Sequence, residues 1–261
     1  MSGTPDATFG GRITIVTGAG SGIGAAVARR LAFGGATVYR TDITPIEGSA
    51  TPGATATQPA PLVLDVREET AWDAVIETVL GQHGRLDVLV HAAGISAASP
   101  IADTPLTEWR RVLAVNLDGT FLAIRHGIRA MSETGGAIVV IGSAAGIRPA
   151  GGAAAYSTSK AAASMLVRAA AKECQMRDPP IRINIVSPGG VRTPMWTSMP
   201  FFQDLIREHG SEERAFEVLE AEGGGRFADA DDVANAVLYL LSDAASHVTG
   251  VELPVDHGYT L

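Results

Sequence analysis

The sequence predicts an α/β protein in which a doubly wound parallel sheet is covered by helices on both faces. Short β-branched runs alternate with longer stretches rich in alanine and leucine. The β-branched runs are continuously apolar, which is typical of parallel strands buried on both sides. A glycine-rich turn joins the first strand to the first helix, so the chain begins with a β-α-β unit. The alternation of strands and helices that follows predicts a single α/β layer architecture.

The individual elements follow in chain order. The opening unit consists of a strand at 12–17, a helix at 22–33 and a strand at 36–41. Later apolar runs predict strands at 61–65, 86–91, 137–142, 181–187 and 250–255. Longer periodic stretches predict helices at 70–83, 105–132, 154–177 and 231–242. Because no repeat or linker divides the chain, we expect a single domain over 1–261.

Two segments interrupt the alternation. Residues 44–61 are dense in Thr, Pro, Ala and Gly and predict a surface loop. Residues 193–225 place large apolar side chains ahead of a charged helix, namely Trp196, Met199, Phe201 and Phe202. Such an insertion favours a lid over a ligand, and the alternative is a surface helix packed by those rings.

Composition excludes several classes of protein. The 261 residues carry a net charge of −8, are 46% apolar and contain no apolar run long enough to span a bilayer. The amino-terminal residues lack the basic and apolar regions of a signal peptide, so we expect a cytoplasmic protein. An acidic chain without basic clusters also disfavours nucleic acid and membranes as partners.

Cysteine and histidine give no sign of a metal site. Cys174 is the only cysteine and falls in an apolar helical stretch, where packing is favoured over a reactive thiol. The histidines show no ligand-like spacing with one another or with Cys174, so no metal is expected.

A glycine loop, Thr17 to Gly24, connects the first strand to the first helix. Glycines let the backbone turn tightly and approach a phosphate, whose charge is offset by free N–H groups and the helix dipole. The spacing Gly-x-x-x-Gly-x-Gly differs from the commoner Gly-x-Gly-x-x-Gly, but its strand-to-helix placement favours a dinucleotide over a purely structural turn. The candidate contacts are Gly18, Ser21, Gly22, Ile23 and Gly24.

Cofactor choice depends on the end of the second strand. Asp42 stands there, and its carboxylate would accept hydrogen bonds from the adenosine ribose and repel a 2′-phosphate. Arg40 is the counter-argument for NADP, although it could pair with Asp42 instead. Neither Ser21 nor Ile43, which we also expect at the cofactor, adds a cation, so NAD is predicted and NADP is less favoured.

A second polar group lies around the start of the predicted helix 154–177. Tyr156 and Lys160 are four residues apart and would share one helix face, where the ammonium would lower the tyrosine pKa towards neutrality. The same spacing also arises by chance on helix surfaces. Ser143 directly follows a predicted strand, so its hydroxyl could hold a substrate carbonyl. Asn116 interrupts an apolar helical stretch, either for function or as a helix-packing amide.

Together these features resemble the compact form of the short-chain dehydrogenase/reductase family over nearly the whole chain. The matching motifs are the Thr17 to Gly24 loop, Asp65-Val66, His91-Ala92-Ala93-Gly94, Asn116, Ser143, Tyr156 with Lys160, and Pro188-Gly189 followed by Thr193. The resemblance implies a Rossmann-type fold and an NAD(P)-dependent oxidoreductase acting on small molecules. It also implies a homotetramer in which the helices 105–132 and 154–177 pair across subunits.

The resemblance further implies site roles. The catalytic group would be Asn116, Ser143, Tyr156 and Lys160, with Tyr156 exchanging the proton and Asn116 and Lys160 holding a water-linked relay. Asp65 and Val66 would flank the adenine. The remaining cofactor contacts would be Ala92, Ala93, Gly94, Tyr156, Lys160, Pro188, Gly189, Val191 and Thr193. One motif departs from the family, which usually has Asn-Asn-Ala-Gly at 91–94; we expect His91 to replace a sheet contact rather than to add a base.

These observations predict an NAD-dependent enzyme that interconverts a secondary alcohol and a ketone. The alternatives are an NADPH-dependent carbonyl reductase of a biosynthetic pathway and a non-catalytic cofactor-binding regulator. The predicted pocket favours an apolar or alicyclic, hydroxysteroid-like substrate, and its residues are Ile95, Ile147, Pro149, Trp196, Met199 and Phe202. Arg148 either binds an acidic substrate or is a solvated loop residue. His257 either packs or is exposed to solvent, or it belongs to a tail that reaches a neighbouring subunit.

Overall fold

The computed structural model describes residues 9–47 and 58–261 and contains one seven-stranded sheet in the order β3-β2-β1-β4-β5-β6-β7. The strands are β1 (Ile13–Thr17), β2 (Thr37–Asp42), β3 (Leu62–Val63), β4 (Val88–His91), β5 (Gly136–Ile141), β6 (Ile181–Pro188) and β7 (Glu252–Val255). Every neighbouring pair is parallel. The predicted α/β class and its parallel sheet are therefore confirmed.

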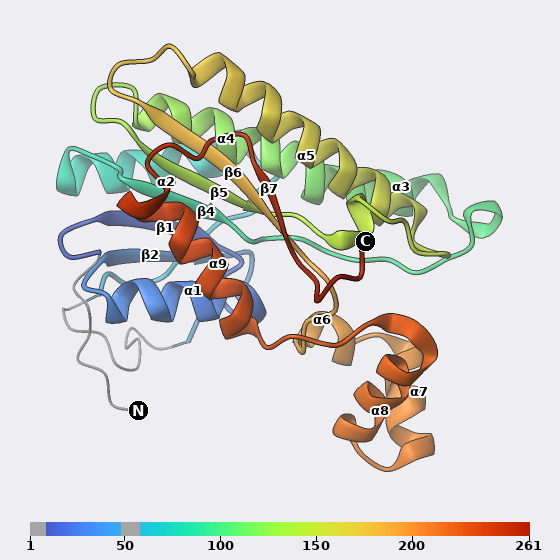
Figure 1. Ribbon diagram of the computed structural model, residues 1–261. Helices are drawn as coiled ribbons and strands as arrows, with labels where there is room; N and C mark the ends of the chain where they lie inside the picture. The colour runs from blue at the N-terminus through green and yellow to red at the C-terminus, as the bar shows by residue number, and fades with distance from the viewer. Residues whose placement is uncertain (1–8, 48–57) are drawn as a thin grey trace.

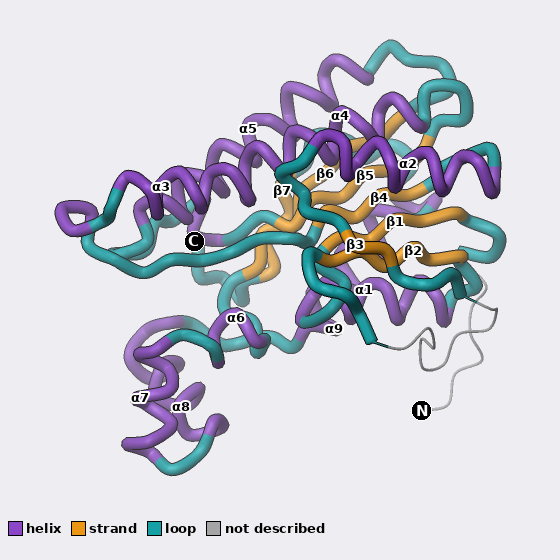
Figure 2. The backbone as a smooth tube through the Cα atoms, turned by 180° about the vertical axis from the view of Figure 1, so that it is seen from behind, coloured by secondary structure: helices purple, strands orange, loops and turns teal. Residues whose placement is uncertain are grey.

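Helices cover both faces of this sheet (Figure 1, Figure 2). They are α1 (Gly22–Phe33), α2 (Glu69–His83), α3 (Leu106–Leu113), α4 (Gly119–Ala130), α5 (Ala154–Cys174), α6 (Pro194–Thr197), α7 (Pro200–His209), α8 (Glu212–Leu219) and α9 (Ala230–Leu241). None of the helices within 9–47 and 58–261 is long and apolar enough to cross a membrane.

Most predicted bounds agree with the structure within a few residues, and two segments differ. The strand predicted at 61–65 is reduced to the two residues of β3. The single helix predicted at 105–132 is divided into α3, a π-helical turn at Ala114–Asp118 and α4. Of the loop predicted at 44–61, residues 48–57 lie outside the described residues.

Alternate side chains of each strand enter two separate cores. Ile15 and Leu89 pack in one core with residues of α2, α4 and α5. Val16 and Val90, the next residues along the same strands, pack in the other core with residues of α1 and α9. This alternation explains why the strands read as continuously apolar, because both of their faces are buried.

The strand order reverses at β1. Its neighbour on one side is β2 and on the other side is β4, so the chain winds away from β1 in both directions. Parallel sheets of this kind bind ligands outside the carboxyl ends of the strands at the reversal. The residues that follow β1 and β4 therefore occupy the position expected for a cofactor.

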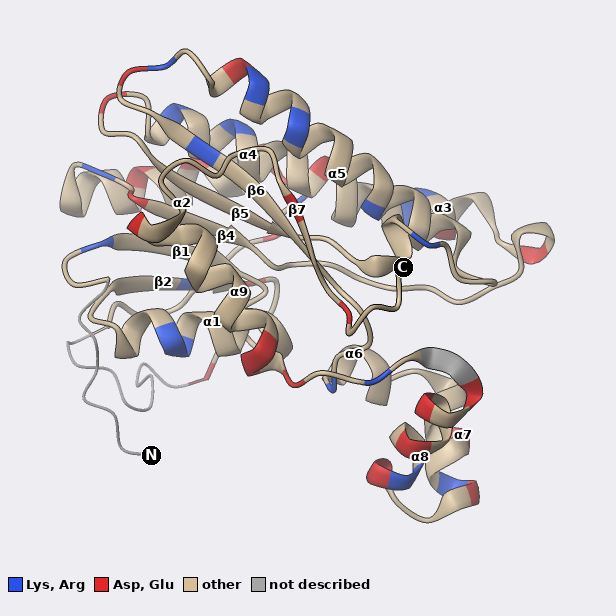
Figure 3. Cartoon of the chain, in the orientation of Figure 1, with Lys and Arg blue, Asp and Glu red and all other residues tan. Residues whose placement is uncertain are grey.

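The segment 193–225 forms α6, α7 and α8, which project from the carboxyl edge of the sheet (Figure 1). We call this segment the lid. Phe202, Phe216 and Phe227 are buried together in a small core of their own, and the ring centroids of Phe202 and Phe216 are 4.6 Å apart. Both acidic and basic residues occur along α7 and α8 (Figure 3). The lid is thus a folded helical unit rather than an extended loop.

Candidate active site

Tyr156 and Lys160 lie on the first turns of α5 and face the same side. The Lys160 Nζ atom is 5.7 Å from the centroid of the Tyr156 ring and donates a hydrogen bond of 2.8 Å to the carbonyl of Ile141, the last residue of β5. Lys160 is buried, with only 6% of its surface exposed. The prediction that Tyr156 and Lys160 share one face of α5 is confirmed, and the Lys160 hydrogen bond connects this face to β5.

Burial is the main cause of the pKa shifts of both Tyr156 and Lys160. It raises the pKa of the Tyr156 phenol, against a hydrogen bond with Ser143 that lowers it. Burial lowers the pKa of Lys160 to about 8. The expectation that Lys160 would shift the pKa of Tyr156 towards neutrality is therefore not met in this structure, since desolvation of the phenol outweighs other influences. The lysine itself is the group with a pKa near neutrality.

Ser143 follows β5 directly, as the sequence indicated. Its Oγ atom accepts a hydrogen bond of 3.1 Å from the backbone N–H of Ala145 and so caps the short turn Ala144–Gly146. The same hydroxyl is hydrogen-bonded to Tyr156. Ser143 and Tyr156 therefore present two hydroxyl groups side by side at the carboxyl end of the sheet.

Asn116 lies in the π-helical turn between α3 and α4 and is buried. Its Oδ1 atom accepts from the Ile95 N–H at 2.9 Å, and its Nδ2 atom donates to the Ile95 carbonyl at 2.9 Å and to the Ser159 Oγ atom at 3.0 Å. The amide thus joins the segment after β4 to α5. Turns of π-helix often mark functional positions, and here the turn places a polar residue in an apolar helix.

Ser159 is a residue that the sequence analysis did not single out. Its hydroxyl accepts from Asn116 and donates to the Tyr156 carbonyl at 2.7 Å. It therefore completes a hydrogen-bonded connection from Asn116 to the backbone of Tyr156. The sequence offered one indication of this role: Ser159 directly precedes Lys160, and a buried serine needs hydrogen-bond partners.

The glycine loop packs closely against the segment after β4. A Cβ atom on Gly18 would lie 2.8 Å from the Ala93 nitrogen, and one on Gly24 would lie 2.2 Å from the Gly18 carbonyl oxygen. Gly18 and Gly22 also have positive φ angles of 64° and 53°, which glycine adopts without strain. Ser21 stands at the N-cap of α1, and Ile23 packs against the core beneath. Because its glycines have no Cβ atom, the loop packs this closely and its backbone can come near a phosphate.

Thr17 and His91 connect this loop to the end of β4. The Thr17 Oγ1 atom accepts hydrogen bonds of 3.1 Å from both the Ala92 and the Ala93 N–H groups and lies 3.0 Å from the His91 Nδ1 atom. The Thr17 hydroxyl oxygen already accepts from two N–H groups, so the hydroxyl donates its own proton to the His91 Nδ1 atom. We therefore assign the ring proton of His91 to the Nε2 atom. The predicted sheet contact of His91 is confirmed.

His91 is held neutral in this position. It is 1% exposed, and burial, together with the charge of Lys160, lowers its pKa to about 3. Its Nε2 atom has no hydrogen-bond partner among the described residues. Because burial disfavours the protonated imidazolium, the His91 ring stays neutral. Its role in the structure is to connect the end of β4 to Thr17 at the end of β1.

On the adenine side, Asp42 reaches the glycine loop. Its Oδ2 atom accepts a hydrogen bond of 3.0 Å from the Gly20 N–H. The following Ile43 is exposed, whereas Arg40 is 8% exposed and burial lowers its pKa. Arg40 therefore lies within the protein rather than beside the exposed edge at which a 2′-phosphate would lie.

The Asp65-Val66 pair lies next to this edge. The Asp65 carboxylate is paired with Arg67, whose hydrogen bonds lower the Asp65 pKa. The Val66 carbonyl accepts from the Trp72 indole N–H at 3.0 Å. A Cβ atom on Gly119 would lie 2.9 Å from the Val66 side chain. The two residues are thus held rigidly, and the side chain of Val66 lies against α4.

The loop after β6 meets the glycine loop from the other side. Pro188 ends β6, and the Thr193 methyl group lies 3.3 Å from where a Gly22 Cβ atom would be. Val191 is buried and bridges to Ala228. A Cβ atom on Gly189 would lie 3.1 Å from Asp256 near the carboxyl terminus. These contacts gather the predicted cofactor residues from β1, β4 and β6 around one edge.

The predicted substrate residues divide into two groups. Ile147 and Pro149 are exposed and follow Ser143 closely in sequence, whereas Ile95 is half-buried and its backbone is hydrogen-bonded to Asn116. Trp196 and Met199 pack against the core of the lid, and Phe202 is completely buried within it. The prediction that Phe202 lines the pocket is therefore wrong, because its ring stabilises the lid from inside. The alternative interpretation, aromatic packing of a surface helical unit, describes Phe202 correctly.

The structure also settles three side chains that the sequence left open. Cys174 is buried, and burial raises its thiol pKa, which fits a packing role. Arg148 is an exposed loop residue, as one of the two interpretations predicted, and its guanidinium donates a hydrogen bond of 2.7 Å to the Tyr259 carbonyl near the carboxyl terminus. His257 lies exposed in the turn at the end of its own chain.

A polar cavity of about 640 Å³ lies on the lid side, lined by Arg192, Glu213, Glu220, Arg226, Phe227, Ala228, Asp229, Asp232, Val255, Asp256 and His257. It contains none of the four predicted catalytic residues. Its acidic side chains form no metal-binding group, and the rest of the described chain holds none either.

Comparisons with known proteins cover nearly the whole chain. The family model described as enoyl-(acyl carrier protein) reductase matches residues 18–260. The 3-alpha-(or 20-beta)-hydroxysteroid dehydrogenase of Mycobacterium bovis is 36% identical over 251 residues, which cover 95% of this chain and 89% of that protein. The cyclopentanol dehydrogenase of a Comamonas species is 36% identical over 253 residues, covering 95% and 97%. The ligand-free structure of the Thermoplasma acidophilum aldohexose dehydrogenase has a TM-score of 0.84 at 30% identity, covering 99% of this chain and 96% of that one.

Proposed function

The chain belongs to the short-chain dehydrogenase/reductase family and is an oxidoreductase that acts on CH–OH groups, and we propose that its substrate is a cyclic or steroid-like secondary alcohol and its cofactor NAD. The main support for this reaction is that the Ser143 and Tyr156 hydroxyl groups are hydrogen-bonded to each other and lie close to the buried Lys160. The two relatives at 36% identity are named for hydroxysteroid and cyclopentanol oxidation. Exposed apolar side chains at Ile147 and Pro149 suit such a substrate better than a sugar.

The residues present fit a nicotinamide dinucleotide. A Cβ atom at Gly18 or Gly24 would close the backbone cradle, and the Asp42 carboxylate lies at the loop where ribose hydroxyls would be held. Gly18, Ser21, Gly22, Asp42 and Thr193 would hold the cofactor, which supplies or accepts hydride when it is bound. Buried Arg40 favours NAD over NADP, because a 2′-phosphate would meet Asp42 rather than an accessible cation.

In the proposed reaction, the Ser143 hydroxyl orients the substrate oxygen and Tyr156 exchanges its proton. During ketone reduction the phenol donates its proton to the oxygen as hydride reaches the carbon. During oxidation the phenolate takes the hydroxyl proton as hydride leaves. The raised pKa of Tyr156 favours the phenol, which is the form that donates its proton during ketone reduction. Lys160, with a pKa of about 8, exchanges protons near working pH, and Asn116 holds the neighbouring backbone.

A spectrophotometric screen tests this function. Purified protein would be offered cyclopentanol, a hydroxysteroid and an aldohexose with NAD and with NADP, and NADH or NADPH formation would be followed. Tyr156→Phe should lower kcat by about 10²- to 10⁴-fold while leaving NADH binding intact, because only the acid–base group is removed. Full turnover by Tyr156→Phe on an accepted alcohol would disprove the mechanism. Preference for NADP by the wild type would favour the carbonyl reductase alternative, and Asp42→Ala should relax the preference for NAD.

We also propose that the protein is a homotetramer. Phe121 on α4 and Met165 on α5 are large apolar side chains that are 50% and 62% exposed, on the two helices that the family resemblance places between subunits. Static light scattering on the purified protein tests the assembly. A single species of monomer mass at micromolar concentration would overturn it.

A further inference from the structure

The last six residues, 256–261, fold into a tight turn at the carboxyl edge of the sheet, which we call the C-terminal turn. His257 and Gly258 have positive φ angles of 52° and 81°. The Asp256 carboxylate closes the turn by accepting hydrogen bonds from the Gly258 N–H at 3.0 Å, the Thr260 N–H at 3.0 Å and the Thr260 hydroxyl at 2.6 Å. A non-glycine residue with positive φ needs such support from its surroundings, so the turn has one defined shape.

Tyr259 connects this turn to the loop that follows the catalytic strand. The Arg148 Nη1 atom donates a hydrogen bond of 2.7 Å to the Tyr259 carbonyl. The guanidinium carbon of Arg148 lies 4.9 Å from the centroid of the Tyr259 ring, within the range of a cation–π contact. Arg148 is five residues after Ser143, so the turn holds the loop that also carries the exposed Ile147 and Pro149.

The same tyrosine ring touches the end of the lid. A Cβ atom on Gly225 would lie 3.3 Å from the Tyr259 Cδ2 atom. Gly225 has a φ angle of 77° and is the last of three consecutive glycines where the lid returns to the sheet. A glycine run of this kind gives the backbone the freedom needed at a hinge. Tyr259 therefore lies between the hinge of the lid and the catalytic loop.

The turn also contacts the loop after β6. The Asp256 backbone and side chain lie 3.1 Å from where a Cβ atom of Gly189 would be. Catalytic loop, lid hinge and the loop after β6 are thus all in contact with six residues at the end of the same chain.

We propose that Tyr259 is a positioning residue that couples the lid hinge at Gly225 to the catalytic loop at Arg148 and thereby sets the size of alcohol that the site accepts. This inference rests on the proposed function for its substrate. Arg148 is the partner through which Tyr259 acts, and Asp256 fixes the turn that presents the ring. The contacts of the C-terminal turn described above are with Arg148, Gly225 and Gly189, so we expect its effect on substrate fit rather than on the proton transfer.

Steady-state kinetics of four variants test the coupling. Tyr259→Ala removes the ring but leaves the backbone carbonyl, Arg148→Ala removes both contacts, Arg148→Lys keeps the charge, and Tyr259→Phe is the conservative rescue. A partly exposed cation–π contact and one charged hydrogen bond correspond to a change of about three- to tenfold. We expect Tyr259→Ala and Arg148→Ala to raise KM for the alcohol by this factor. The increase should differ between cyclopentanol and a hydroxysteroid. Both kcat and the KM for NAD should stay unchanged. Tyr259→Phe should match the wild type.

Hydrogen–deuterium exchange provides a readout that does not depend on activity. Backbone amides of the lid and of residues 144–152 should exchange about three- to tenfold faster in Tyr259→Ala than in Tyr259→Phe, while β5 and β6 stay protected. If the wild type oxidises no secondary alcohol, the proposed function fails and this comparison still decides the coupling. Unchanged lid exchange in Tyr259→Ala overturns the coupling, and so does an unchanged ratio of KM values for the two alcohols when the wild type oxidises both.

Discussion

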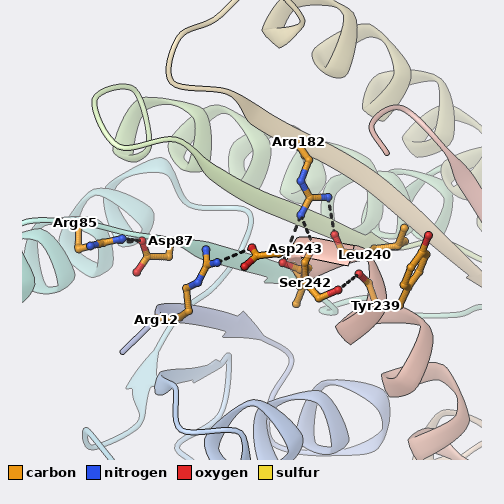
Figure 4. Close-up of polar contacts among 9 residues, drawn as sticks. Arg12, Arg85, Asp87, Arg182, Tyr239, Leu240, Ser242 and Asp243 are labelled. Atoms are coloured by element: carbon orange, nitrogen blue, oxygen red, sulfur yellow. Dashed lines mark hydrogen bonds and ion pairs between the residues drawn. The ribbon is translucent and has the colours of Figure 1, made fainter. Parts of the chain in front are cut away.

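The two ends of the parallel sheet use polar side chains in opposite ways. At the amino end, Arg182 of β6 donates hydrogen bonds to the carbonyls of Leu240, Leu241 and Ser242, where α9 ends (Figure 4). Asp87 accepts from the Ile13 N–H at 2.8 Å and pairs with Arg85. At the carboxyl end, half-buried Tyr156 and buried Lys160 and His91 have shifted pKa values, and His91 keeps one nitrogen without a partner among the described residues.

This difference separates stability from function. Polar groups at the amino end have their hydrogen-bonding capacity filled by the protein itself, so they hold strands and helix ends together. Groups at the carboxyl end are desolvated but incompletely paired, which is costly for the fold and useful for chemistry. Variants at the carboxyl end should therefore change ligand binding or pH dependence, and variants at the amino end should change only stability.

The largest expected effect is the loss of cofactor binding in Gly24→Ala. The new Cβ atom would lie 2.2 Å from the Gly18 carbonyl oxygen and 2.7 Å from its carbon, both of which are backbone atoms that cannot rotate away. We expect NADH affinity, measured by fluorescence titration, to fall by at least about 100-fold, since such a clash costs several kcal/mol.

Gly81→Ala is the matched control for that variant. Gly81 lies inside α2, and nothing stands within 4 Å of its added methyl group. The substitution should leave NADH affinity unchanged and stabilise the protein by about 0.5–1 kcal/mol, the usual gain for alanine in a helix. Equal affinities for NADH in the two variants would mean that the glycine loop does not hold the cofactor.

The second expected effect is an acid sensitivity that originates at His91. Its pKa is lowered from 6.5 to about 3, so the folded state binds its proton less readily than the unfolded state. The stabilising contribution is complete above pH 6.5 and is lost as the pH falls towards 3, with an upper limit of about 5 kcal/mol. Urea unfolding at pH 7, 5.5 and 4 should show a steeper loss of stability in the wild type than in His91→Asn.

Asparagine is the informative replacement because it can accept the Thr17 hydroxyl hydrogen bond without titrating. Other acidic and histidine groups remain in both proteins, so their contribution cancels in the difference between the two pH profiles. Parallel profiles would contradict the assignment of the acid-sensitive step to His91.

The sequence predicted the carboxyl end of the sheet better than the lid. Glycine spacing, Asp42 and the Tyr156–Lys160 pair are local patterns, and their positions follow from where strands end and helices begin. His91 was also interpreted correctly as a sheet contact, because its neighbours in sequence lie at a strand end. These features depend on contacts that the backbone topology determines.

The features that the sequence analysis missed depend on contacts between distant segments. The burial of Phe202 requires Phe216 and Phe227 to close a separate core around it, and an apolar ring at a helix start is equally compatible with a pocket. The π-helical turn at Asn116 arises where the amide bonds Ile95 and Ser159 from two other segments. The pKa of Tyr156 was misjudged because helical spacing indicates the distance to Lys160 but not the desolvation of the phenol.

A smaller effect is expected from Arg182→Met at the amino end. The guanidinium supplies hydrogen bonds to four carbonyls, including those of the last turn of α9, and carries the positive charge favoured at a helix carboxyl terminus. Losing these interactions should lower the free energy of unfolding by about 2–3 kcal/mol, as measured by urea denaturation. At a temperature where both proteins are folded, kcat and KM should equal those of the wild type. A selective loss of kcat would break the division between the two ends.

The smallest effect is expected from Arg12→Ala, which is close to Arg182 in Figure 4 but different in setting. Arg12 pairs with Asp243 at 2.9 Å, yet the two side chains are 35% and 91% exposed. Water and salt screen such a pair, and ordering two mobile side chains offsets much of the attraction, so the loss of stability should stay below about 1 kcal/mol. Adding 0.5 M NaCl should reduce the difference between Arg12→Ala and the wild type further, because the Debye length then falls below about 5 Å. A loss that matches that of Arg182→Met and resists salt would show that the exposed pair, and not the capping of α9 by Arg182, holds the amino end of the sheet together.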